Sequence, residues 1–146
     1  DTFIATRILN GDFPDYRRII PENGIMTATF STSDFLEAVK LTNVFAKDAT
    51  GSAIKVMFDP KGLITILSSA QQTGEHESQI AAEIVADETV KPLTVVINSK
   101  YLLDMMSNIK SDKIDVTLNE ATTSPCLFKT LEDENLLHVI ARMQVS

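Results

Sequence analysis

The sequence contains one pattern twice, and this internal repeat restricts the fold more than any other feature. The stretch Phe35-Leu36-Glu37-Ala38-Val39 aligns with Leu102-Leu103-Asp104-Met105-Met106, an offset of 67 positions (102 minus 35). Phe30-Ser31 aligns with Ile97-Asn98 at the same offset. In each copy a strand-like stretch is followed by a helix-capping residue and then by a helical pattern. The repeat predicts one domain made of two similar halves.

Hydrophobic periodicity predicts the same order of elements in both halves: a strand, a helix and three further strands. The expected strands are 25–31, 53–58, 63–69, 75–86, 93–98, 113–118, 125–131 and 136–145. The first helix is expected from Ser33 to about Ala46, with a cap at Ser31, Thr32 or Ser33 and with Phe35, Ala38, Val39 and Thr42 buried. The second is expected over 100–110, with Leu102, Met105, Met106 and Ile109 buried. The predicted fold class is α+β, with two helices on one face of an eight-stranded antiparallel sheet system; an α+β domain without internal symmetry is the alternative.

Composition limits the function. The net charge is −7 and the pI is about 4.7, whereas a protein that grips nucleic acid through phosphates needs a basic face. The single cysteine, Cys126, excludes an internal disulfide and favours a cytoplasmic protein. No apolar run approaches the ~18 residues that span a bilayer. We therefore expect no membrane association, and the residue types show no spacing that predicts a metal site or cofactor.

A segment of unusual composition precedes the repeat. Residues 10–24 read NGDFPDYRRIIPENG and follow TFIATRIL, residues 2–9, which has the pattern of a strand. Together, residues 7–21 resemble the junction between the second and third domains of the bacterial DNA polymerase III β subunit, the sliding-clamp family. The stretches NSKYLLDMM and ATTSPCLF resemble that family's third domain, and HVIARMQV resembles its ending.

The resemblance implies a DNA clamp fold, with pseudo-twofold symmetry, two helices and eight strands in two βαβββ units. It assigns residues 1–24 to the last strand of a preceding clamp domain and an interdomain linker, and residues 25–146 to the third (C-terminal) domain. The chain begins at Asp1 without a methionine, so we expect a fragment. Without its own domain, the strand at 2–9 is expected to be disordered or to add to an exposed sheet edge.

The implied function is a non-catalytic processivity factor. Members of the family form a head-to-tail homodimeric ring around double-stranded DNA, with the helices lining the hole. They hold DNA polymerase III on DNA and bind its alpha subunit, the clamp-loader delta subunit and other proteins through a short peptide motif. An acidic body suits a ring that slides, since tight phosphate contacts would act as friction.

Three sets of residues match family sites. The peptide-binding pocket would consist of Pro14, Arg18, Ile19, Asn98, Tyr101, Thr122, Ser124, Val139, Ile140, Ala141, Arg142 and Met143. The subunit interface would include Val44 and Phe45, and the DNA-facing lysines would be Lys40, Lys47, Lys100 and Lys110. Ala141 and Arg142 depart from the family, which has a bulky residue and a proline there.

Two other classes of function remain open. An enzyme would use Cys126 or a serine as nucleophile and His76 or His138 as base, but neither Cys126 nor His138 has an acidic neighbour at a recognisable spacing. A stand-alone peptide-binding or scaffold domain with the clamp fold is the second alternative. A gene that encodes two further copies of the unit of one strand, one helix and three strands would favour the ring.

Overall fold

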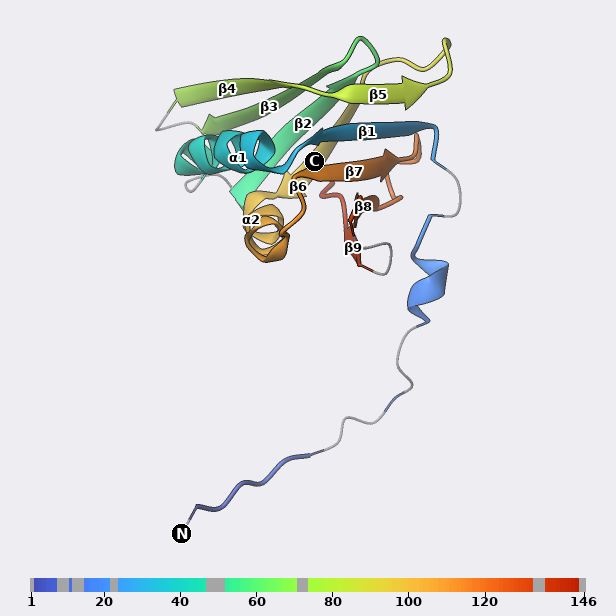
Figure 1. Cartoon of the computed structure of the whole chain (residues 1–146). Helices are drawn as coiled ribbons and strands as arrows, with labels where there is room; N and C mark the ends of the chain where they lie inside the picture. Colours follow the sequence, from blue (N-terminus) through green and yellow to red (C-terminus); the bar gives the residue numbers. More distant parts are fainter. Residues whose placement is uncertain are drawn as a thin grey trace.

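The computed structural model of the chain describes residues 2–7, 11, 15–21, 24–46, 52–70, 74–132 and 136–144 (Figure 1). Over these ranges the elements are, in chain order, η1 (Tyr16–Arg18), β1 (Met26–Ser31), α1 (Thr32–Ala46), β2 (Ala53–Asp59), β3 (Leu63–Ala70), β4 (Gly74–Ala81), β5 (Glu83–Ala86), β6 (Leu93–Asn98), α2 (Ser99–Asn108), β7 (Lys113–Leu118), β8 (Cys126–Thr130) and β9 (Leu137–Ile140). Neither α-helix of this part is long and apolar enough to cross a bilayer.

The strands form two antiparallel sheets, and each sheet contains strands from both halves of the sequence. One has the order β5-β1-β7-β8-β9 and the other β4-β3-β2-β6. Strand β1 pairs with β7, the strand that follows the helix of the second half, and β6 pairs in the same way with β2. This reciprocal pairing confirms the pseudo-twofold arrangement of two βαβββ units.

The strand predicted over 75–86 is wrong as a single element. It breaks at Ala82, where the backbone N–H donates to the Gly62 carbonyl at 3.0 Å. The part before the break pairs with β3, and the part after it pairs with β1 in the other sheet. A change of sheet requires the chain to bend, so one predicted strand becomes two and the described residues hold nine strands where eight were expected.

The last strand is shorter than predicted for the same reason. It ends at Ile140, and the N–H of Met143 then donates to the Val96 carbonyl of β6 at 2.7 Å. Residues 141–144, which we call the tail, therefore cross from the edge of one sheet to the edge of the other. The tail is the counterpart in the second half of β5 in the first.

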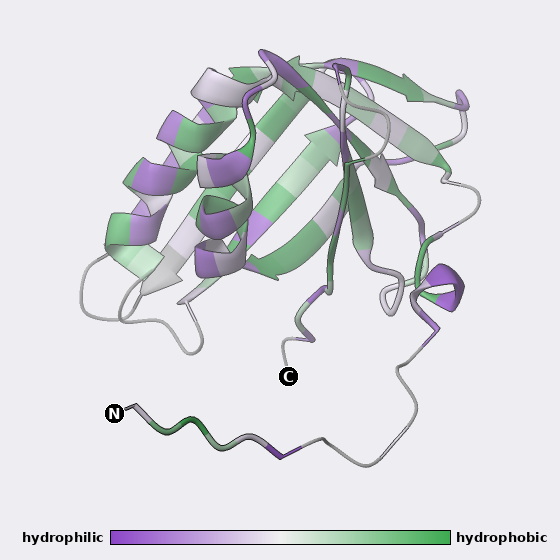
Figure 2. Ribbon diagram, turned by 60° about the horizontal axis from the view of Figure 1, so that its bottom comes forward, coloured by the Kyte–Doolittle hydropathy of each residue, from purple (hydrophilic) through white to green (hydrophobic). Residues whose placement is uncertain are grey.

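The two helices lie side by side on one side of the molecule (Figures 1 and 2). Helix α1 starts one residue earlier than expected, and Oγ of Ser31 accepts a hydrogen bond from the Asp34 N–H at 3.3 Å. Helix α2 is capped by Asn98. The residues predicted to be buried on both helices are buried, because each amphipathic helix lays its apolar face on the sheets.

Each helix also begins with a buried hydroxyl group that bonds to the other half. Thr32 and Ser99 are equivalent in the repeat, since 99 minus 32 is again 67. The hydroxyl of Thr32 donates to the Ser111 carbonyl at 2.6 Å, just before β7. The hydroxyl of Ser99 donates to the Ser52 carbonyl at 2.9 Å, just before β2. Two equivalent bonds thus join the halves.

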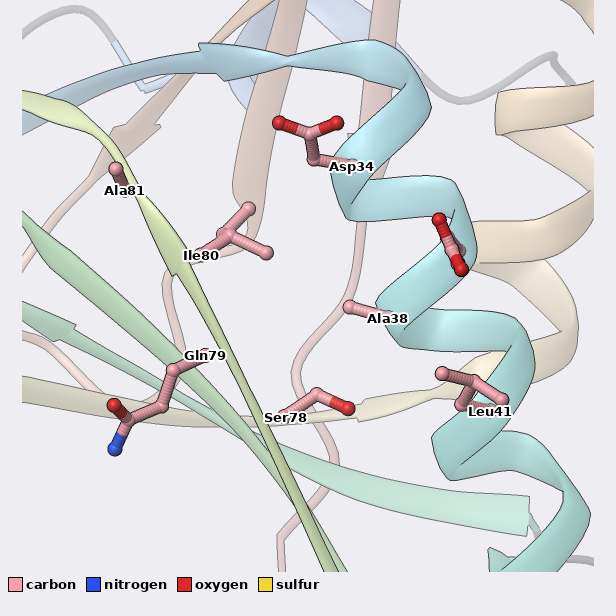
Figure 3. A pocket seen from close by; sticks show the side chains of 8 residues that line it. Asp34, Ala38, Leu41, Ser78, Gln79, Ile80 and Ala81 are labelled. Carbon is pink, nitrogen blue, oxygen red and sulfur yellow. The ribbon is translucent and has the colours of Figure 1, made fainter.

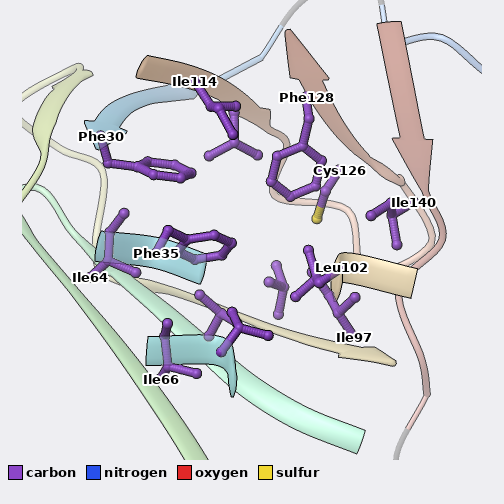
Figure 4. Close-up of a cluster of buried hydrophobic side chains, with 14 of the residues drawn as sticks. Phe30, Phe35, Ile64, Ile66, Ile97, Leu102, Ile114, Cys126, Phe128 and Ile140 are labelled. Carbon is purple, nitrogen blue, oxygen red and sulfur yellow. The ribbon is translucent and has the colours of Figure 1, made fainter. Parts of the chain in front are cut away.

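The core lies between the helices and the inner faces of both sheets (Figure 4). The rings of Phe30 and Phe35 contact each other, with centroids 4.6 Å apart. Cys126 is fully buried, and its sulfur points into the same cluster as Phe128 and Leu102. Both halves therefore share one core, as expected for a single domain.

The N-terminal segment departs from its sequence pattern. Residues 2–7 are exposed and lie in no strand, with Phe3 90% exposed, so the strand predicted over 2–9 is not formed there. A strand needs a partner for its backbone N–H and C=O groups, and residues 2–7 pair with none. An alternating pattern of side chains does not by itself supply a partner for the backbone groups.

Candidate functional site

The linker residues Arg18 and Ile19 lie in η1 and directly after it. The Asp15 carboxylate caps this short helix: Oδ1 accepts from the Arg17 N–H at 3.2 Å, and Oδ2 lies 3.5 Å from Nε of Arg18. The Arg18 side chain is 86% exposed, so water screens this ion pair and it contributes little. Ile19 is half exposed. Both side chains are therefore accessible to a ligand.

Asn98 and Tyr101 lie at the start of α2. The side-chain carbonyl of Asn98 accepts from the Lys100 N–H at 2.9 Å, so the helix uses it as a cap. Tyr101 is 62% exposed, although it belongs to a helix whose other large apolar side chains are mostly buried. An exposed aromatic ring of this kind is a ready wall for an apolar ligand group.

Thr122 and Ser124 lie in the turn of residues 119–125 between β7 and β8. Thr122 is exposed and Ser124 is half-buried. The Ser124 N–H donates to the Ala121 carbonyl at 2.9 Å, which closes the turn locally. The turn thus presents two small hydroxyl side chains near the surface.

The side chains of β9 and the tail differ in exposure. Val139 faces solvent and is 38% exposed, whereas Ile140 faces the core and is 7% exposed. Ala141 is exposed, and Arg142 and Met143 are half-buried. Because successive residues of a strand point to opposite faces, Val139 and Ile140 cannot line the same surface equally.

Arg142 joins the tail to the turn. Its Nη2 donates to the Asn119 carbonyl at 2.7 Å, and its Nη1 donates to the Ala121 carbonyl at 3.2 Å. Helix α2 also contacts β9, and the tail bonds to β6 through Met143. The structure therefore brings the tail together with the turn and with the end of β6, the strand that leads into α2.

The linker is not joined to this group of residues. Over the described ranges, no hydrogen bond or ion pair connects Arg18 or Ile19 to the turn or the tail. Pro14 lies outside the described residues. Nine of the twelve predicted pocket residues therefore lie on the domain, whereas Arg18 and Ile19 lie in the linker.

A cavity of about 390 Å³ lies elsewhere, between α1 and β4 (Figure 3). Its lining residues are Asp34, Glu37, Ala38, Leu41, Ser78, Gln79, Ile80 and Ala81. Sequence reasoning missed this cavity, because the position of β4 at a sheet edge follows from the break at Ala82. Acidic side chains on one wall and apolar ones on both give it a mixed character.

The predicted interface pair, Val44 and Phe45, lies at the end of α1. Phe45 is next to β4, the strand that forms one wall of this cavity. Val44 is 58% exposed. The Phe45 ring stacks on the His76 ring of β4, with centroids 4.8 Å apart and planes at 2°. His76 also bonds to the Ser78 hydroxyl at 2.9 Å. The pair is thus one exposed and one partly packed side chain beside an unpaired strand edge.

The predicted DNA-facing lysines are all on the helix side where they are described. Lys40, Lys100 and Lys110 are exposed, and Lys47 lies outside the described residues. The same helices expose Asp34, Glu37 and Asp104. Hydrophilic residues recur along both helices (Figure 2). The helix side is a mixed surface and not a basic patch.

Of the residues considered for enzyme chemistry, His138 lies in β9, which pairs with the β8 strand of Cys126, and His76 lies in the other sheet. Burial raises the pKa of the Cys126 thiol, while the nearby Arg142 guanidinium lowers it, and burial outweighs the charge. A thiol held neutral is a poor nucleophile. The described residues contain no group of three or more potential metal ligands.

Comparison with known proteins decides the family. Residues 17–144 match the family described as DNA polymerase III beta subunit, C-terminal domain. The chain belongs to this family. It is 26% identical over 135 residues to the beta sliding clamp of Bacillus subtilis, covering 92% of the chain and 35% of the relative. With the beta sliding clamp of Synechococcus elongatus it is 25% identical over 146 residues, covering 99% and 37%.

Solved clamp structures have the same fold. A sliding clamp from Bartonella birtlesii superposes with a TM-score of 0.81 at 28% identity, over 94% of this chain and 37% of that one. A DNA polymerase III beta subunit from Thermotoga maritima gives a TM-score of 0.85 at 21% identity, over 96% and 36%. The chain thus spans about a third of the length of these sliding-clamp relatives.

Proposed function

We propose that this clamp domain is the third domain of a ring-shaped processivity factor, a subunit that tethers DNA polymerase III to DNA without catalysing a reaction. The ring would close as a head-to-tail homodimer in the cytoplasm. The relatives named beta sliding clamps, about three times as long as the chain, support this proposal. So does the reciprocal pairing of the two halves, which builds a wall with both helices on one side.

We propose that the helix side faces double-stranded DNA. Lys40, Lys100 and Lys110 would approach phosphates, while Asp34 and Asp104 on the same helices would keep these contacts weak. Lys47 belongs to the same proposed set. Affinity for DNA rises with each phosphate that a protein neutralises. A mixed surface on a chain of net charge −7 suits a ring that surrounds DNA and moves along it.

The face formed by α1 and β4 is proposed as the subunit contact. Val44 is exposed at the end of α1, and Phe45 packs against β4 through His76. Strand β4 is the edge of its sheet, so its outer backbone groups are free to pair with another strand. The adjacent cavity would receive side chains of the other subunit.

Partner proteins, such as the polymerase alpha subunit and the clamp-loader delta subunit, are proposed to bind through a peptide motif beside the tail. The observation that carries this is the contact of the tail with the turn and with the end of β6, together with the exposure of Tyr101 on α2 and of Val139 on β9. Arg18 and Ile19 would complete the site from the linker. Apolar walls with a few polar groups are what an extended peptide needs.

A fluorescent Gln-Leu-x-Leu-Phe peptide tests the proposal by anisotropy titration. If the peptide buries ~400 Å² of apolar surface, the gain is about 10 kcal/mol. Association costs at least ~4 kcal/mol, which leaves a Kd of tens of micromolar. We expect this weak value, because the preceding domain supplies the other half of the pocket. A peptide with both leucines and the phenylalanine changed to alanine is the control. Submicromolar binding would refute the half-pocket argument, and equal binding of the control would refute the site.

A further inference from the structure

In each half of the molecule, the segment that passes from one sheet to the other is hydrogen-bonded to the turn between the second and third strands of that half. In the first half the crossing residue Ala82 does so through its backbone, which donates to the Gly62 carbonyl in the β2–β3 turn. In the second half the crossing lies in the tail, and the Arg142 side chain donates to the Asn119 and Ala121 carbonyls of the β7–β8 turn. The two contacts are equivalent in the fold but differ in chemistry.

We propose that Arg142 is a positioning residue that holds the β7–β8 turn against the tail and so sets the shape of the peptide site. The inference rests on the proposed peptide-binding function, because Thr122 and Ser124 lie in that turn. Arg142 acts through the turn and does not itself contact the peptide.

The lengths of the turns explain why a side chain is used. The β2–β3 turn consists of residues 60–62, and Gly62 has φ +95°, so its backbone stays compact and close to Ala82. The β7–β8 turn consists of residues 119–125 and is more than twice as long. A planar guanidinium reaches two carbonyls of a long turn at once, which a single backbone N–H cannot do.

The charged guanidinium of Arg142 makes its hydrogen bonds within the domain. No carboxylate of the described residues lies within ion-pair distance of Arg142, and both terminal nitrogens are taken by backbone carbonyls. Its Nε is buried. Nε has no hydrogen-bond partner among the described residues, but Nη1 and Nη2 both donate to the turn, which is the arrangement of a group that holds the turn against the tail.

The rate at which the Cys126 thiol is labelled can be used to measure how often this contact opens. Cys126 is the only cysteine of the chain, it is fully buried, and it begins β8 directly after the turn. A thiol reagent can reach this buried sulfur only when the structure around it opens, so the labelling rate follows the opening equilibrium. No peptide is needed for this measurement, and its result is independent of the proposed function.

The test compares Arg142→Met and Arg142→Lys with the unchanged chain, using the labelling rate of Cys126 with a disulfide reagent. Methionine keeps a long side chain over the thiol but cannot donate hydrogen bonds. We expect labelling about tenfold faster in Arg142→Met, and a smaller increase in Arg142→Lys, which keeps one donor group. Loss of Arg142 removes a charge that lowers the thiol pKa, and this alone would slow labelling. A faster reaction therefore reports opening.

Arg7→Met is the matched control, since Arg7 is exposed in the N-terminal segment, and its rate should not change. Melting temperatures identify a variant that has lost its fold, in which case Arg142→Lys decides. An unchanged rate in folded variants would overturn the proposal. In the peptide titration, Arg142→Met should weaken neutral and acidic versions of the motif equally. A loss confined to the acidic version would show that Arg142 contacts the ligand and would also overturn it.

Discussion

The Ser99→Ala substitution tests whether the two halves are joined as the structure indicates. The hydroxyl of Ser99 is fully buried, donates to the Ser52 carbonyl and has its oxygen 2.6 Å from Oδ1 of Asn43 in α1. The substitution removes this donor and leaves the Ser52 carbonyl, just before β2, without its hydrogen bond. Asn98 still caps α2, so the helix itself should form as before.

The expected cost follows from the buried carbonyl. A buried group left without its partner costs about 1–3 kcal/mol, and we take about 2. For a domain of this size, the free energy of unfolding falls by about 2 kcal/mol per molar urea. The urea midpoint should therefore fall by about 1 M. Far-ultraviolet circular dichroism is the suitable probe, because the chain has no tryptophan.

Ser107→Ala is the matched control on the same helix. Its hydroxyl donates to the Asp104 carbonyl at 2.9 Å but is exposed, so water replaces the bond and the change should stay within about 0.5 kcal/mol. Thr32→Val removes the equivalent bond of the other half and should cost as much as Ser99→Ala. Equal midpoints for Ser99→Ala and Ser107→Ala would refute the reasoning.

Two further predictions concern Gly24, which lies against the second half of the molecule, and the buried thiol of Cys126. In Gly24→Ala the new methyl would overlap Cγ2 of Thr117 and approach the Leu118 carbonyl to 2.9 Å, so the melting temperature should fall by several degrees; an unchanged value would contradict the close approach. The second uses pH: burial raises the pKa of the Cys126 thiol, so its contribution to stability is complete below the unfolded-state pKa and is lost as the pH rises through the folded-state pKa. Urea midpoints between about pH 8 and about pH 11 should therefore fall more steeply for the unchanged chain than for Cys126→Ala, and equal slopes would contradict the burial of an uncharged thiol.

Local sequence signals predicted the parts of the fold that depend on local physics. The apolar spacing of Phe35 and Leu102 gave both helices, because one face must be buried. Gly62, with φ +95°, is also a local feature, because this backbone conformation favours glycine. The offset between the halves predicted the pseudo-twofold arrangement before any pairing was known.

Features that depend on distant partners were missed. The break at Ala82 and the end of β9 at Ile140 arise because the chain changes sheets, and nothing in the alternation of side chains marks that point. The cavity beside β4 follows from the same break. The role of Arg142 depends on the length of a turn about twenty residues earlier in the chain, which no local pattern reveals.

The peptide site as a whole is the least predictable part from sequence. Tyr101 and Val139 could be assigned to it only through the family resemblance, and the structure shows them exposed. Ile140 was predicted for the same site but is 7% exposed, because it lies on the opposite face of β9. Burial of a single side chain depends on register, which the sequence pattern does not determine at a short edge strand.

The most direct test of the account is to map the binding of the Gln-Leu-x-Leu-Phe peptide by nuclear magnetic resonance on the isotope-labelled chain. We expect the largest shift changes at Ile19, Tyr101, Ser124, Val139 and Met143. Signals of Leu41 and Gln79, at the cavity between α1 and β4, should stay unchanged. Shifts confined to that cavity, or none at millimolar peptide, would contradict the claim that the tail and its turn form the partner-binding site.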